Sequence, residues 1–240
     1  AYIDSLALLV AATVLRDHAD CDLLPRVVHV HHHRRPEADD EADHVMSVAR
    51  RLDVPSVVID VETAGAPPAV ARAARYDALT AAAIDARAGW VATGHHAGDQ
   101  LETVLAALGR GAGPTGLAGM ACARPLHADV TLIRPMLQCT RVQAAELCTR
   151  AGVSWCDDPG NDDPQTQRGR LRRDVIPVLE AMWPGVAPRV SAMSETQSMA
   201  ATAFEGVIAA RFGPVDRSRW ARRSLRELPA AVLASGLRRS

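Results

Sequence analysis

The chain contains 240 residues, of which 48% are apolar and 23% are charged, a composition typical of a globular protein rather than a disordered one. Its formal net charge is −1, and all 27 basic residues are arginine, which excludes a Walker-type phosphate loop and any lysine nucleophile or general base. No window approaches the roughly 20 consecutive apolar residues of a membrane helix, and no signal-peptide pattern opens the chain, so we expect a soluble cytoplasmic protein with no membrane partner.

Short β-branched runs alternate with longer segments of helical character. The predicted strands are 26–30, 56–60, 90–93 and 130–133, and the predicted helices are 38–52, 67–87 and 98–109. This alternation is typical of right-handed βαβ units, so we expect an α/β fold with a Rossmann-like parallel sheet and helices on both faces. In such sheets, ligands bind beyond the carboxyl ends of the strands.

Glycine, proline and acidic residues interrupt the rest of the chain. We predict a mobile glycine-rich loop at 109–119 and a second polar loop at 156–167. A domain boundary is expected near 183–188, where prolines precede a tail with a helical pattern. The five cysteines include no CxxC pair, which favours reduced thiols over a disulfide framework or a zinc site.

A short polar turn, Asp4–Ser5, leads directly into an apolar helical run near the start of the chain. A helix N-terminus exposes free backbone N–H groups and a partial positive charge, so this turn could hold a phosphate. Asp and Ser are also common helix caps, and the local sequence leaves both interpretations open.

The segment 93–108 follows a predicted strand and places His95, Asp99 and Glu102 at spacings of four and three, which puts them on one helical face. Such a cluster could bind a divalent cation, hold an ammonium group or transfer protons. The alternatives are a metal-hydrolase site completed by the histidines of 29–33, and a capped helix with solvated charges.

Arginines gather in three places that suit phosphate contacts. Arg72 and Arg75 precede Tyr76 on the predicted helix 67–87, where an arginine either binds phosphate or lies on the surface. The other two clusters make residues 121–240 net positive, with 17 Arg against 12 acidic residues, which favours a polyanionic partner. A solvated helix face explains the last cluster equally well. The first of these two clusters consists of Arg168, Arg170, Arg172 and Arg173, and the last consists of Arg217, Arg219, Arg222, Arg223 and Arg226.

In chain order, these motifs resemble a known enzyme family. The segments IDSLALL, VHVHH with Arg35, RxxRY, TGHHxxDQxETVL, RGxGxxGLAGM, RPML and DPxNxDxxxxRxRxR follow one another between Ile3 and about Pro188. Their order and spacing resemble the bacterial tRNA(Ile)-lysidine synthetases of the PP-loop ATP pyrophosphatase superfamily. The resemblance implies a PP-loop ATP-binding catalytic domain over 1–185 and a helical tRNA-binding domain over 186–240, of which we expect this chain to contain only a part.

The same resemblance implies a two-step ligation on a tRNA base. ATP adenylates the carbon-2 oxygen of the wobble cytidine in the isoleucine tRNA with a CAU anticodon, which releases pyrophosphate. The side-chain amine of free lysine then attacks that carbon and displaces AMP, and the product base is lysidine. Magnesium is expected to neutralise phosphate charge during the first step.

Roles for individual residues also follow from the resemblance. Asp4, Arg75 and Asp99 match catalytic positions of the family, and the tail residue Arg223 is expected to contact tRNA. The implied sites are Asp4, Ser5, His31 and Arg75 for ATP; Asp99 and Glu102 for lysine; Arg168, Arg170 and Arg172 for tRNA; and Asp4 and Asp99 for magnesium.

The start of the chain departs from the family pattern. Ala1 and Tyr2 stand where the family has paired glycines in its phosphate loop, and a tyrosine there obstructs the close approach of pyrophosphate to the backbone. We expect either that the first strand and the start of the loop are missing from this chain, or that the protein is a catalytically impaired tRNA-binding protein. Another PP-loop tRNA-modifying enzyme, such as a thiolase, is disfavoured by the lack of a CxxC pair.

Overall fold

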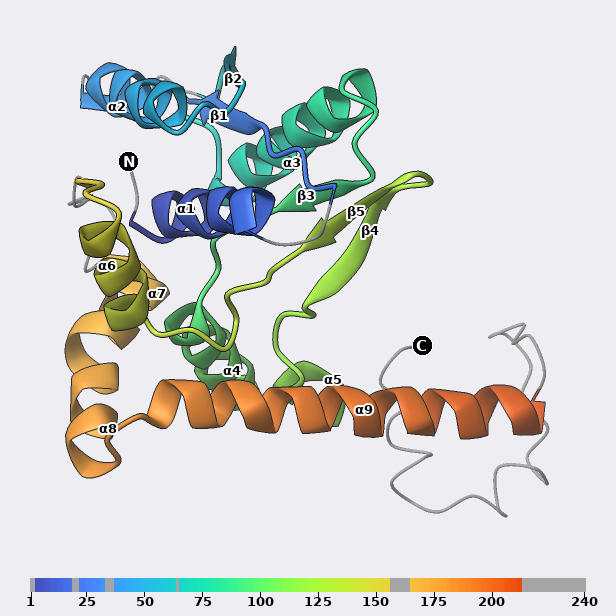
Figure 1. The fold of residues 1–240 in the computed structure, drawn as a ribbon. Coiled ribbons are helices and arrows are strands. Elements are labelled where there is room, and N and C mark those ends of the chain that lie inside the picture. Colours follow the sequence, from blue (N-terminus) through green and yellow to red (C-terminus); the bar gives the residue numbers. More distant parts are fainter. Residues whose placement is uncertain (1–2, 19–21, 33–36, 64, 156–164, 213–240) are drawn as a thin grey trace. The chain divides into compact units, whose positions relative to one another are not determined.

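The computed structural model describes residues 3–18, 22–32, 37–63, 65–155 and 165–212 (Figure 1). The chain forms two compact units, one made of segments 1–97 and 122–163, the other of 98–121 and 164–240. The first unit contains α1 (Ile3–His18), β1 (Val27–His31), α2 (Glu37–Arg51), β2 (Ser56–Asp60), α3 (Pro68–Asp85), β3 (Trp90–Ala92), β4 (Ala123–His127), β5 (Val130–Ile133) and α6 (Arg141–Arg150). The second contains α4 (Ala97–Gly109) from its second residue on, α5 (Pro114–Leu117), α7 (Gln167–Arg170), the π-helical turn η2 (Leu171–Val175), α8 (Ile176–Met182) and α9 (Val186–Phe212).

The strands of the first unit form two small sheets. Strand β1 pairs in parallel with β2, with His31 opposite Asp60, and β3 pairs in parallel with β5. These parallel pairs confirm the expected α/β fold, and the four predicted strands match the observed ones to within one residue at each end. Strand β4 was not expected: it pairs antiparallel with β5 and forms the edge of the sheet β3-β5-β4.

Neighbouring residues of a strand point to opposite faces of the sheet, so a strand can pack against helices on both sides. Val27 of β1 packs against a cluster formed by α1, α2 and α6, whereas Val28 and Val30 pack against α3 and β5. Leu6 is 2% exposed and Leu132 is 0% exposed, so each cluster contains a fully buried leucine. Burial of one such side chain stabilises the fold by roughly 1.5–3 kcal/mol.

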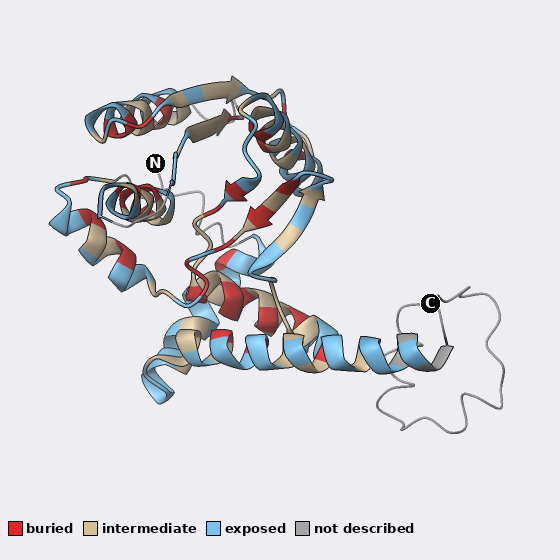
Figure 2. Ribbon diagram, turned by 45° about the vertical axis from the view of Figure 1, so that its right-hand side comes forward, coloured by how far each residue is buried: buried red, intermediate tan, exposed pale blue. Residues whose placement is uncertain are grey.

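In the second unit, α5 packs against α9. The buried residues of α9 include Ser191, Ser194 and Ala201, whose small side chains form a narrow stripe on a helix that is otherwise largely exposed (Figure 2). The loop predicted at 109–119 contains the short helix α5, which begins at a proline in its first turn. The helical pattern predicted for the tail is confirmed by α9 as far as Phe212; residues 213–240 lie outside the described residues, and the pattern stays a prediction there.

The predicted boundary near 183–188 falls at the turn between α8 and α9, but both helices belong to the second compact unit, which is not divided there. The division into domains 1–185 and 186–240 stays a prediction. None of the described helices combines the length and the apolarity that a membrane-spanning segment requires.

Candidate functional site

Polar side chains lie at the carboxyl ends of the parallel strands in the first unit. His31 is the last residue of β1 and is 4% exposed; its Nε2 lies 3.1 Å from Oδ1 of Asp39, and its Nδ1 lies 3.9 Å from Oδ1 of Asp60. The neighbouring His32 contacts the Oγ1 of Thr63 at 3.1 Å. Histidine and aspartate side chains therefore lie close together at the carboxyl ends of β1 and β2, where α/β folds bind ligands.

Asp4 lies in the first turn of α1, beside the segment that follows β3. Its Oδ1 is 3.7 Å from Nε2 of His96, and both side chains are largely buried. A Cβ placed on Gly94 would lie only 2.6 Å from the carbonyl oxygen of Asp4 and 2.8 Å from the backbone nitrogen of Ser5. Only glycine permits this approach, so Gly94 fixes where the start of α1 sits against the β3–α4 connection.

Ser5 is exposed in the same first turn, as a phosphate-binding role requires. Ala1 and Tyr2, the positions that depart from the family pattern, lie outside the described residues. His33 and Arg35 also lie outside them.

His95 does not share a helical face with Asp99 and Glu102, so that prediction is wrong. Helix α4 begins at Ala97, and His95 precedes it with its Nδ1 2.8 Å from the Oγ1 of Thr93. The helical spacing holds for Asp99 and Glu102 alone, because a residue before the first turn does not follow the 3.6-residue period.

Asp99 and Glu102 of the second unit hold the guanidinium of Arg172. The Nη2 of Arg172 lies 3.2 Å from Oε2 of Glu102 and 3.4 Å from Oδ1 of Asp99, and its Nε donates to Oε1 of Glu102. The Nε of Arg168 lies 3.9 Å from Oε2 of Glu102. Residues 70 positions apart in the sequence thus meet in a bidentate ion pair.

Burial raises the pKa of Glu102, and the hydrogen bond and charge of Arg172 lower it by less, so the pKa stays above its usual value. The side chain of Glu102 is 3% exposed, whereas that of Arg172 is 28% exposed. The pair therefore places a carboxylate of increased basicity next to a cation that solvent can still reach.

The local backbone explains why two arginines reach one carboxylate. Thr166 caps α7 by accepting from the backbone N–H of Gly169, and η2 then widens the helix by one π-helical turn at 171–175. Such turns often occur at functional sites. Arg170 is exposed, and Arg173 pairs with its neighbour Asp174. The last arginine cluster, Arg223 included, lies outside the described residues.

Gln100 was not predicted as a functional residue from the sequence, but the structure places it among the buried polar residues, with 3% of its surface exposed. Its amide accepts from the backbone N–H of Met120 at 2.8 Å and donates to the carbonyl of the same residue at 3.1 Å. Gly119, with φ +63°, lies directly against this side chain. Gln100 therefore fixes the end of the glycine-rich segment to α4.

Helix α3 carries the arginines predicted from the RxxRY segment. Arg72 donates to the hydroxyl of Tyr76 at 3.2 Å and lies over its ring, with its Cζ 5.1 Å from the ring centroid. Arg75 is exposed on the same helix. Two arginines that were not predicted join them: Arg124 of β4, 4.9 Å from the ring centroid, and the buried Arg134, which hydrogen-bonds to the Tyr76 side chain.

His29 should make stability depend on pH. Burial, followed by the charges of His31, Arg75 and His32, lowers the pKa of His29 from 6.5 to about 4. The folded state therefore favours the neutral ring, so this contribution is complete above pH 6.5 and is lost as the pH falls from 6.5 through 4. We expect His29→Gln to lose less free energy of unfolding than the wild type between pH 7 and pH 4, as measured by urea denaturation. The exposed His127→Gln is the control, and parallel profiles for His29→Gln and wild type would contradict the assignment.

A site of metal-hydrolase type is not present in the described part of the chain, where no three His, Cys, Asp or Glu side chains gather around a common point. The oxygen donors of Asp4 and Ser5 nevertheless suit magnesium, which takes one or two protein carboxylates and completes its shell with water and substrate phosphates.

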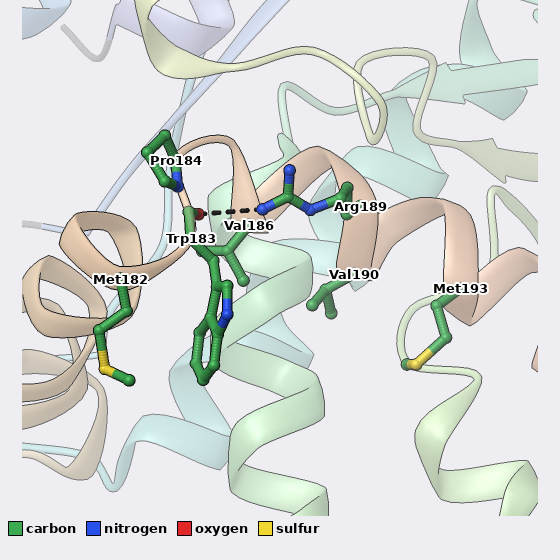
Figure 3. A pocket seen from close by; sticks show the side chains of 7 residues that line it. All are labelled: Met182, Trp183, Pro184, Val186, Arg189, Val190 and Met193. Carbon is green, nitrogen blue, oxygen red and sulfur yellow. Dashed lines mark hydrogen bonds between the residues drawn. The ribbon is translucent and has the colours of Figure 1, made fainter.

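An apolar pocket lies in the second unit around the turn between α8 and α9 (Figure 3). Arg189 is its one charged lining residue and donates to the carbonyl oxygen of Trp183 at 3.1 Å. The lining consists of Met182, Trp183, Pro184, Val186, Arg189, Val190 and Met193. This lining contains no carboxylate and no nucleophile.

Comparison with known proteins places these sites in a family. The sequence profile of the PP-loop domain matches residues 3–179, which include every predicted site residue except Arg223. The chain belongs to the PP-loop domain family. This membership confirms the PP-loop domain that the ordered motifs indicated. It also accounts for the parallel strands β1 and β3, of which β1 ends at His31 and β3 lies just before Gly94.

Named relatives are similar over much of this PP-loop chain. The tRNA(Ile)-lysidine synthase of Salinispora arenicola is 48% identical over 135 residues, which cover 55% of this chain and 40% of that protein. The tRNA(Ile)-lysidine synthase of Xanthomonas campestris is 37% identical over 204 residues, which cover 83% of this chain and 46% of that protein. The chain thus spans less than half the length of these relatives.

A solved structure supports the PP-loop fold independently. The U34-tRNA thiolase NcsA from Methanococcus maripaludis, solved with its 4Fe–4S cluster, aligns with a TM-score of 0.63 over 81% of this chain and 67% of its own. At 17% sequence identity, this likeness concerns the fold alone.

Proposed function

We propose that the protein uses ATP and magnesium to join lysine to the wobble cytidine of the isoleucine tRNA with a CAU anticodon, forming lysidine. The observation that carries the proposal is the carboxylate pair of α4, which already holds a cationic side chain, in a PP-loop protein similar to tRNA(Ile)-lysidine synthases. The ammonium group of lysine carries the same charge as the guanidinium of Arg172. We therefore assign Asp99 and Glu102 to lysine.

The first unit is proposed to bind ATP. The N-terminus of α1 supplies backbone N–H groups and the exposed hydroxyl of Ser5 for phosphate oxygens. Asp4 is the proposed magnesium carboxylate of this unit, and a magnesium role for Asp99 of α4 stays a prediction from the family resemblance. Magnesium, when bound, would neutralise phosphate charge as pyrophosphate leaves. Arg75 on α3 and His31 at the end of β1 complete the proposed ATP contacts.

Two chemical steps then follow. In the first, the carbon-2 oxygen of cytidine attacks the α-phosphorus of ATP, and pyrophosphate leaves. In the second, the side-chain amine of lysine attacks carbon-2, and the oxygen departs with AMP. The lysine ammonium must lose a proton before it attacks, and the carboxylates of Asp99 and Glu102 are the proposed acceptors on α4.

A polyanionic partner is expected to meet the arginines of α7 and η2. Arg168, Arg170 and Arg172 are proposed to contact tRNA phosphates, and Arg223 is proposed to do so from the tail. A tRNA substrate places the protein in the cytoplasm. The competing function, a catalytically impaired tRNA-binding protein, rests on Ala1 and Tyr2 and predicts tRNA binding without turnover of ATP.

Incubation of the full-length protein with ATP, magnesium, labelled lysine and a transcript of the tRNA tests the proposal. Label should enter the tRNA only when all components are present, and it should not enter a methionine tRNA that carries a similar anticodon. The absence of incorporation would contradict ligation. Retained tRNA binding without ATP–pyrophosphate exchange would favour the impaired protein instead.

A further inference from the structure

Four arginines of the first unit surround Tyr76, although only two of them belong to the RxxRY segment. Arg72 and Arg75 come from α3, Arg124 comes from β4, and Arg134 directly follows β5. The guanidinium carbons of Arg72 and Arg124 lie over the Tyr76 ring at 5.1 and 4.9 Å from its centroid. The tyrosine ring therefore contacts two cations through cation–π interactions.

The positive charge of three of these arginines is not neutralised by acidic groups in the described part of the chain. No carboxylate there forms an ion pair with Arg72, Arg75 or Arg124. The titration of Tyr76 reports the same positive field: burial raises the pKa of its phenol, but Arg72, Arg134 and Arg75 together bring it below its usual value. The cluster combines two arginines from residues 1–120, where acidic residues outnumber arginines by 16 to 10, with two from residues 121–240, where arginines are in excess.

The topology brings this cluster to the ligand edge of the sheet β3-β5-β4. Strand β4 runs antiparallel to β5, so Ala123 at its start pairs with Ile133 at the carboxyl end of β5. Arg124 and Arg134 consequently lie at the same edge as the residues that follow β3. Arg72 is exposed and Arg124 is half-buried, so an incoming ligand can reach these arginines while both contact the tyrosine ring.

We infer that Arg72 and Arg124, aligned by Tyr76, form a phosphate-binding site for the RNA backbone on the PP-loop unit. This inference rests on the proposed function and adds a tRNA contact to the arginines of α7, η2 and the tail. The shared chemistry is a phosphate oxygen that accepts from two guanidinium groups. We assign the phosphate to the RNA because the exposed Arg72 and the half-buried Arg124 can be reached from solvent, and because Arg75 is the one arginine of the cluster among the proposed nucleotide contacts.

The test measures tRNA binding by the full-length protein at several salt concentrations for wild type and for Arg72→Gln/Arg124→Gln. Each phosphate contact removed should reduce the slope of log affinity against log salt by about 0.7–1, so the double variant should lose roughly 1.4–2. Arg50→Gln/Arg150→Gln removes two exposed arginines of the same unit and should leave the slope unchanged. Arg72→Lys/Arg124→Lys keeps both charges and should keep most of the slope.

ATP affinity, measured in the same proteins by equilibrium dialysis, separates the two sources of phosphate. An unchanged ATP affinity with a reduced salt slope supports the RNA site. A reduced ATP affinity with an unchanged slope overturns it in favour of a nucleotide contact, and no change in either overturns it as well. If Arg72→Gln/Arg124→Gln does not fold, each single variant should show about half of the reduction in slope expected for the double variant. Lysidine formation by the wild type is assayed in parallel, so failure of the proposed function is distinguished from failure of this site.

Discussion

Asp99→Asn is expected to abolish lysidine formation while leaving the affinity for tRNA unchanged. The carboxylate of Asp99 lies 3.4 Å from Nη2 of Arg172, next to the buried Glu102, so its oxygens face the position of a cation. Asparagine keeps the shape of the side chain but removes its charge, and a loss of at least about a hundredfold in the ligation rate is expected when a charge-stabilising group is removed from a reaction centre. The measurement is the incorporation of labelled lysine at saturating tRNA.

Asp85→Asn is the matched control, because Asp85 is an exposed aspartate at the end of α3. That variant should ligate at the wild-type rate. A wild-type rate for Asp99→Asn would refute the role of Asp99, whereas a parallel loss of tRNA affinity would indicate that the change disturbs the Arg172 segment rather than the reaction itself.

Gly94→Ala is expected to reduce ATP–pyrophosphate exchange by at least about tenfold and to destabilise the fold by about 1–3 kcal/mol, the usual cost of overpacking. The added methyl group would lie 2.6 Å from the carbonyl oxygen of Asp4 and 2.8 Å from the nitrogen of Ser5. Both are backbone atoms, so the first turn of α1 must move, and the proposed phosphate and magnesium contacts move with it.

Gly89→Ala provides the control at the other end of β3, where an added Cβ would lie 3.9 Å from the carbonyl oxygen of Asp129, an ordinary contact distance. It should exchange pyrophosphate at the wild-type rate and unfold at a similar temperature. If both alanine variants behave like the wild type, the start of α1 does not depend on this close approach.

Local patterns predicted most of the elements of the first unit. The β-branched runs at β1, β2 and β5 and the long alanine-rich helix α3 follow from periodicity and composition. Strand β4 could not be predicted in this way, because its sequence ARPLH contains a proline and gains its pairing from the hairpin with β5. Edge strands depend on a neighbour more than on their own residues.

The candidate site was predictable where it depends on neighbouring residues and not where it depends on the fold. Asp99 and Glu102 share a helical face as their spacing predicts, whereas His95 falls before the helix because α4 begins at Ala97. The contact of Arg172 with Glu102 joins positions 70 residues apart, and that of Arg124 with Tyr76 depends on the unpredicted β4. Charge clustering pointed to Arg172 but not to its partner, and it did not point to Arg124 at all.

The most direct test of the central claim follows the α-phosphate of ATP through the two steps. With ATP labelled at the α-phosphorus, magnesium and the CAU-anticodon transcript, but no lysine, label should appear on the tRNA. Addition of lysine should then release that label as AMP while lysidine forms. A tRNA that never acquires the label, or a label whose release does not depend on lysine, would contradict the account.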